Sequence, residues 1–202
     1  TLTLNTGEND LYSAVIDTTN GYAYFGTDTS PGRVVKIQLS DFTRVGAITL
    51  NTGEDSAWTA VIDTTNGYAY FGTLTSPGKV VKIQLSDFTR VGAITLNTGE
   101  NILEAAVIDT TNGYAYFGTF TSPGIVVKIQ LSNFTRVGAI TLNTGENELR
   151  PAAVIDTTSG YAYFGTATSP GKIIKINLST FATSTTLTLN TGENDLYSAV
   201  ID

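Results

Sequence analysis

The feature that most constrains this sequence is a tandem repeat with a period of 46 residues. The segment AVIDTTNGYAYFGT begins at Ala14 and recurs, with few changes, from Ala60, Ala106 and Ala153. A fifth copy opens at Ala199, so the successive spacings are 46, 46, 47 and 46 residues. Self-similarity at a fixed period of this size indicates a repeat architecture in which each copy forms one supersecondary unit.

Within one copy, apolar and polar residues alternate with a period of two, which is typical of short β-strands. Turn segments separate the apolar runs. The segment DTTNG at 17–21 predicts a type I′ hairpin turn, and TSPG at 29–32 predicts a turn with Pro and Gly at its central positions. Four antiparallel strands per copy predict the blade of a β-propeller, with the first strand of each copy lining the axis. We therefore expect one all-β propeller domain over residues 1–202.

Recurring side chains of the second and third strands have predicted structural roles. The pairs Tyr22/Tyr24 and Ala23/Phe25 alternate along one strand and are expected to face opposite neighbouring blades. Packing between blades is favoured over a ligand-stacking platform, because the aromatic residues recur in every copy. The lysines on the polar side of the third strand are expected to form cross-strand ion pairs; they are Lys36, Lys82, Lys128 and Lys175.

The pattern AVID-TTNGYAYFGT-TSPG-VVKI-LSDFTRVGAITL resembles the YVTN-type propeller repeats of bacterial and archaeal surface proteins. The resemblance covers the whole chain, although Tyr-Phe-Gly-Thr stands where those repeats carry their name-giving tetrapeptide. It implies a propeller used for binding, and a location outside the cell or at its surface.

Composition narrows the function classes. The net charge of −7 argues against nucleic acid or an anionic membrane as a partner, because phosphates attract clustered Lys and Arg. No apolar run has the roughly 18 residues of a spanning helix, so membrane insertion is not expected. Cys, His and Met are absent, which removes disulfides, thiolates, imidazole bases and the commonest zinc ligands. Because residue 1 is not Met and no leader follows, we expect a mature or excised segment.

Carboxylates recur in each copy, and a structural role for them is preferred over a metal-binding or catalytic one. A ring of glutamates could hold Ca²⁺, but no EF-hand-like loop accompanies them, so turn capping or inter-blade hydrogen bonding is expected; they are Glu8, Glu54, Glu100, Glu146 and Glu193. Asp17 and its copies are expected to bond their own turns. No phosphate loop, nucleophile elbow or metal motif is present, so we expect no cofactor and no enzyme activity. The alternative, an enzyme with a carboxylate site at the channel mouth, would need an asymmetric polar group near the axis.

The two ends carry the same sequence: residues 1–17 are identical to residues 186–202. A closed four-blade ring needs only one of these copies, so the other should hang free or pair with another chain. Two chains that share one eight-blade ring are an open alternative, and a homo-oligomer through these strands is possible. A structural role in a surface or self-assembling protein is the second functional hypothesis.

The copies differ mainly in two segments, which are the connection from the fourth strand to the next copy and the connection from the second to the third strand. In an up-and-down sheet both connections emerge on one face, whereas the opposite face keeps nearly constant turns. Drift in loops would explain some of this variation, but the variable side chains are of types that recognise partners. We therefore predict a binding face for a protein or glycan, formed by Tyr12, Asp28, Trp58, Leu74, Glu104, Phe120 and Arg150.

Overall fold

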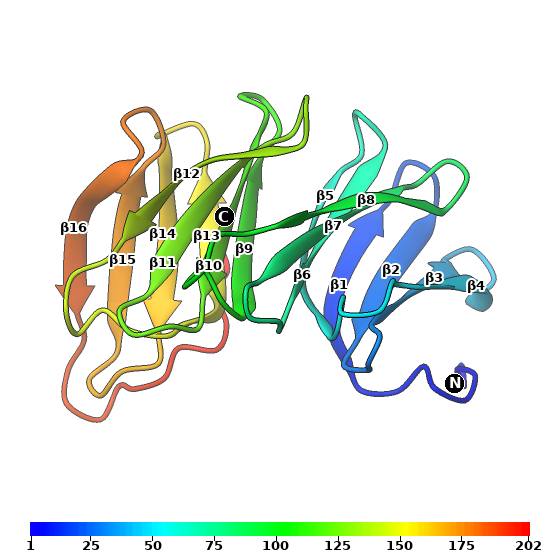
Figure 1. The fold of residues 1–202 in the computed structure, drawn as a ribbon, viewed down its shortest axis with the longest axis horizontal. Coiled ribbons are helices and arrows are strands. Elements are labelled where there is room, and N and C mark those ends of the chain that lie inside the picture. Colours follow the sequence, from blue (N-terminus) through cyan, green and yellow to red (C-terminus); the bar gives the residue numbers. More distant parts are fainter.

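A computed structural model describes all 202 residues. The chain forms sixteen β-strands in four separate four-stranded antiparallel sheets, joined by turns and loops (Figure 1). None of the chain forms a helix of the length and apolarity needed to span a bilayer. The strands are β1 Leu11–Asp17, β2 Tyr22–Thr27, β3 Arg33–Gln38, β4 Thr43–Thr49, β5 Ala57–Asp63, β6 Tyr68–Thr73, β7 Lys79–Gln84, β8 Thr89–Thr95, β9 Leu103–Asp109, β10 Tyr114–Thr119, β11 Ile125–Gln130, β12 Thr135–Thr141, β13 Leu149–Asp156, β14 Tyr161–Thr166, β15 Lys172–Asn177 and β16 Ala182–Thr188.

Each sheet contains four strands that are consecutive in the chain and paired in sequence order. We call the sheets blades 1 to 4 and their strands A to D, so that β1, β5, β9 and β13 are the A strands. Consecutive A strands contact one another, while β4 and β16 lie at opposite ends of the molecule (Figure 1). The all-β prediction and the four-stranded repeat unit are therefore confirmed.

Two turns differ from the sequence prediction. In the A–B turn, only Gly21 has a positive φ, of 74°, and its amide donates to the Asp17 carbonyl, so the loop is not a type I′ turn. In the B–C turn the Ser30–Pro31 peptide is cis and Gly32 keeps a negative φ, so Pro and Gly do not form the expected turn. Both differences recur in the other blades, because the same loop residues recur.

Three apolar cores join the blades in pairs, and their composition confirms the predicted orientation of the aromatic residues. Tyr24 of blade 1 shares a core with Ala69 and Phe71 of blade 2. Tyr70 in turn packs with Ala115 and Phe117 of blade 3. Where two blades meet, therefore, the second Tyr of the B strand faces the next blade and the Phe of the B strand faces the preceding one.

The four blades form an open arc rather than a closed ring. The cores join blades 1–2, 2–3 and 3–4, and no comparable contact joins β13 to β1. The duplicated ends therefore do not compete for one position. Residues 186–188 form the end of β16, whereas the identical residues 1–3 lie outside any strand. Conversely, Leu11–Asp17 forms β1, whereas the identical residues 196–202 form no strand.

The recurring glutamates cap turns, and all except Glu193 also join their entry loop to the D strand of the same blade. Glu54 is buried; its carboxylate accepts from the Asn51 amide at 2.9 Å and from Arg90 Nε at 2.8 Å. Glu8 with Arg44 and Glu100 with Arg136 repeat this ion pair. The turn-capping prediction is confirmed, as it is for Asp17, which accepts from the Asn20 amide at 3.0 Å.

The ion-pair prediction for the lysines is wrong. Lys36 is buried, and its Nζ lies 3.8 Å from the centroid of the Tyr22 ring and 5.5 Å from that of Phe88 in the next blade. Burial lowers the pKa of Lys36, because the ammonium exchanges water for aromatic faces. The period-two pattern placed this residue on the polar side of its strand, but the next blade covers that side.

Candidate recognition face

The D–A and B–C connections contact each other in every blade, which confirms that the two variable segments share one face. The Asp28 amide donates to the Asp10 carbonyl at 2.8 Å, and the Phe120 amide donates to the Ile102 carbonyl at 2.7 Å. The corresponding bond in blade 2 runs from Leu74 to Asp55 at 3.3 Å. Variable side chains from two loops are therefore held together by backbone hydrogen bonds that do not depend on their identity.

A left-handed residue in each D–A connection sets the direction of the side chains that follow. Asp10, Ser56, Ile102 and Glu148 all have φ between 53° and 57°. The next residue starts the A strand, and it is fully buried at Ala57, Leu103 and Leu149. The residue that follows this first strand residue therefore lies at an equivalent position in every copy. We call these five residues the recognition row: Tyr12, Trp58, Glu104, Arg150 and Tyr197.

Blades 1 and 2 contribute an aromatic pair to this row. The rings of Tyr12 and Trp58 are stacked, with centroids 3.7 Å apart and an interplanar angle of 19°. Asp28 lies close by in the B–C loop and accepts a hydrogen bond from Ser56, so the two loops are tied by side chains as well as backbone. Trp58 is half-buried and Tyr12 is exposed, so the pair is accessible to solvent.

Blades 3 and 4 contribute a cluster centred on Arg150. Its guanidinium carbon lies 4.5 Å from the centroid of the Phe120 ring and 5.0 Å from that of Tyr197. Arg150 Nη1 also donates to Glu104 Oε2 at 3.2 Å. Glu104 is only 6% exposed, and burial raises its pKa even though Arg150 favours the charged form. Arg150 Nε is buried with no hydrogen-bond acceptor.

The structure thus gathers six of the seven predicted residues into two clusters on one face. Leu74, in the B–C loop of blade 2, is half-buried and belongs to neither cluster. Tyr197 belongs to the second cluster and was not among the predicted residues. Its signal in the sequence is its equivalence to Tyr12, because residues 186–202 repeat residues 1–17.

The opposite, nearly constant face has three cavities, one between each pair of consecutive blades. Their volumes are 230 Å³ between blades 1 and 2, 220 Å³ between blades 2 and 3, and 270 Å³ between blades 3 and 4. In the first, Asp17 bonds Asn20 and Lys36 lies over Tyr22, so the charged groups already have partners within the blade. These cavities recur because the turns around them recur.

Comparison with known proteins identifies no relative: no protein-family model and no curated protein matches the chain. The structure contains no group of three or more His, Cys, Asp or Glu side chains arranged to hold a metal ion. The candidate site therefore rests on the geometry of this chain.

Proposed function

We propose that this chain is a non-enzymatic recognition scaffold of the propeller type, which binds a protein or glycan through the face that carries the recognition row. The observation that carries the proposal is the contact between variable residues of different copies. Tyr12 stacks on Trp58, and the Arg150 guanidinium lies against both Phe120 and Tyr197. Positions that vary between copies would not be expected to meet in two ordered clusters if they varied only by drift.

The chemistry of these clusters suits recognition. Aromatic and arginine side chains contribute most to binding energy at interfaces, because each covers a large area while retaining a polar or cationic group. The aromatic pair offers a flat surface to an apolar group or a sugar ring, and Arg150, which is ion-paired with Glu104, adds guanidinium donors to the same face. The row is asymmetric, so different blades can contact different parts of one ligand.

The symmetry of the remaining carboxylates supports a role other than catalysis. Glu8, Glu54 and Glu100 each bind an arginine, and Asp17 and Asp63 each bind their own turn. A catalytic centre needs one distinct arrangement of groups with tuned pKa values, whereas these groups repeat with the same partners.

The test uses Trp58, the sole tryptophan, as an internal probe. We would screen the chain against immobilised glycans and follow Trp58 emission with each soluble glycan that is retained. The double variant Trp58→Ala/Phe120→Ala, which lacks the fluorescent probe, should no longer be retained on the immobilised glycan and should keep cooperative thermal unfolding, with Val45→Ala/Val91→Ala as a control on exposed D-strand positions. Undiminished binding by the Trp58→Ala/Phe120→Ala variant would show that another surface is used.

A second candidate function, a structural unit that assembles with itself, is favoured by one specific observation. The outward side of blade 4 has the side chains of a blade–blade interface but no following blade. The likeness to YVTN-type repeats and an extracellular location both remain predictions, and both fit either function.

A further inference from the structure

The three interfaces between blades use one recurring aromatic contact. In each, the second Tyr of a B strand meets the Phe from the C–D turn of the next blade, with ring centroids 5.8 Å apart. The pairs are Tyr24–Phe88, Tyr70–Phe134 and Tyr116–Phe181. The Phe ring also lies 5.2 to 5.5 Å from the lysine Nζ of the preceding blade. A Tyr, a Lys and an incoming Phe thus define the interface.

Blade 4 has the first half of this contact without the second. Lys175 Nζ lies 3.8 Å from the Tyr161 ring and 5.7 Å from the Tyr163 ring, as in the other blades, but no Phe approaches it. Blade 1 has the missing half. Phe42 stands where Phe88 stands in blade 2, has the same positive φ, and is 59% exposed. The two ends of the arc therefore present complementary parts of one interface.

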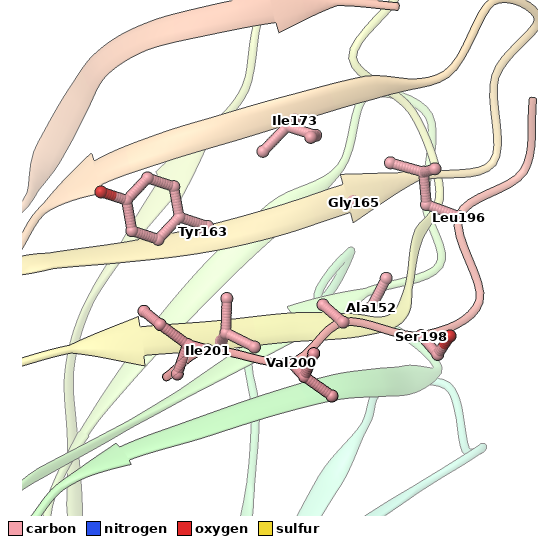
Figure 2. Close-up of a pocket in the computed structure, with 10 residues that line it drawn as sticks. Ala152, Tyr163, Gly165, Ile173, Leu196, Ser198, Val200 and Ile201 are labelled. Atoms are coloured by element: carbon pink, nitrogen blue, oxygen red, sulfur yellow. The ribbon is translucent and has the colours of Figure 1, made fainter. Parts of the chain in front are cut away.

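The C-terminal segment shows how an A strand begins to dock on blade 4. The Gly171 amide donates to the Glu193 carbonyl at 2.7 Å, just as the Gly124 amide donates to the Glu146 carbonyl at 2.8 Å. Leu196 lies against Gly165 (Figure 2). Leu149 lies against Gly118 in the same way in blade 3.

Beyond Leu196, however, the docking is incomplete. Residues 198–201 form no strand, and Val200 is almost fully exposed. The segment and blade 4 enclose an apolar cavity of 370 Å³ lined in part by Val154, Tyr163 and Ile173 (Figure 2). In blade 3 the equivalents of these residues, Val107, Tyr116 and Val126, are buried against blade 4.

We propose that this side of blade 4 binds blade 1 of a second copy of the chain, head to tail. Phe42 of the second copy lies against Tyr163, and its β1 takes the place that residues 196–202 hold in the single chain. The sequence identity of residues 1–17 and 186–202 identifies the occupant, because the docked segment already has the sequence of β1. Leu11, 44% exposed in blade 1, then becomes buried like Leu103 and Leu149.

Such an interface joins two different surfaces, so it propagates until it closes into a ring or continues as a filament. Tyr197 of the recognition row lies in the replaced segment, and β1 of the second copy carries Tyr12 at the equivalent position.

The first experiment measures mass by light scattering over a dilution series of the full chain. We expect the mass to rise above 21.4 kDa as concentration increases. A mass of 21.4 kDa at every concentration would overturn the proposal.

Point variants then locate the interface. Phe42→Ala and Tyr163→Ala should each weaken association by roughly tenfold or more, because each removes half of an aromatic pair at the centre of the contact. Val45→Ala is the matched control, since Val45, Val91 and Val137 have nearly equal exposure in three blades and so lie outside the interface. Unchanged association in both Phe42→Ala and Tyr163→Ala would contradict the assignment.

Mixing the two variants tests the head-to-tail geometry. A Phe42→Ala chain keeps Tyr163, and a Tyr163→Ala chain keeps Phe42, so one intact interface forms between unlike chains. We expect a mixed pair when the two variants are combined at concentrations where each alone is monomeric. Failure to form the mixed pair, with wild-type association confirmed, would exclude head-to-tail docking.

Discussion

Tyr12 and Trp58 occupy equivalent positions in consecutive copies, and their rings stack at 3.7 Å across the boundary between blades 1 and 2. Each residue is the second of its A strand and lies two positions after a left-handed loop residue, and that geometry recurs in blades 3 and 4. The backbone is therefore constant while the side chains of the row are free to differ. This relationship underlies the proposed recognition face.

The stacked pair predicts a spectroscopic effect. Tyr12→Ala should shift Trp58 emission to longer wavelength, because removal of the Tyr ring exposes the indole face to water. Stability should fall by about 0.5–1.5 kcal/mol, the value of an aromatic pair beyond its buried area. Fluorescence and chemical unfolding would measure both effects. Tyr197→Ala is the control, and an equal emission shift in it would contradict the pairing.

The glutamate–arginine pair predicts a large loss of stability from a single truncation. Arg90→Ala leaves the buried Glu54 carboxylate without its charged partner, so the free energy of unfolding should fall by about 2–3 kcal/mol. Arg33→Ala is the control, since Arg33 donates only one exposed bond, to the Thr6 carbonyl at 3.4 Å. Equal losses in the two variants would show that the pair with Glu54 contributes little.

The same pairs predict a dependence on pH. The Arg44 guanidinium lowers the pKa of Glu8; burial opposes the charge of Glu54, but Arg90 and the Asn51 amide outweigh it and lower its pKa. A carboxyl whose folded pKa is lowered contributes stability above its unfolded pKa, about 4.3, and loses it as pH falls through the folded pKa. The temperature of thermal unfolding should therefore fall below about pH 4.3. Arg44→Ala/Arg90→Ala should weaken that dependence, and an unchanged acid profile would count against the pairs as its source.

Close approach of consecutive blades predicts that Gly72 cannot be replaced without cost. A Cβ at Gly72 would lie 2.7 Å from Thr59 Cγ2 and 2.9 Å from Leu103 Cβ, so Gly72→Ala should destabilise the chain by about 1–3 kcal/mol. Gly92→Ala is the matched control in another strand of the same blade, because open space surrounds that position and its φ is not positive. Denaturant unfolding would measure the stability of the two variants. An unchanged stability of Gly72→Ala would show that the blades can move apart at little cost in free energy.

The left-handed loop position predicts a stabilising substitution. Ile102 has a φ of 55°, a conformation that β-branched residues strongly disfavour and that Asn tolerates. Ile102→Asn should raise the free energy of unfolding by about 1 kcal/mol, and Ser56→Asn, at a φ of 57°, should raise it less. A loss of stability in Ile102→Asn would mean that apolar contacts of the Ile side chain outweigh the backbone strain.

The sequence by itself determined the repeated unit, the strand order and the two faces of the arc. These follow from patterns within one copy, which are the period of two along each strand and the short turns between strands. Comparison of the copies also predicted which loops vary, and the backbone bonds from Asp28 to Asp10 and from Phe120 to Ile102 place those loops together.

Tertiary structure decided what depends on the neighbouring blade. Lys36 lies on the polar side of its strand in the sequence, yet Phe88 of blade 2 helps cover it, so it packs on aromatic rings instead of forming an ion pair. The partners of Arg150 come from blade 3 and from the C-terminal segment, and no pattern within one copy predicts them. The open side between blades 4 and 1 also depends on how consecutive blades pack, because local alternation sets which face a side chain takes but not where the arc ends.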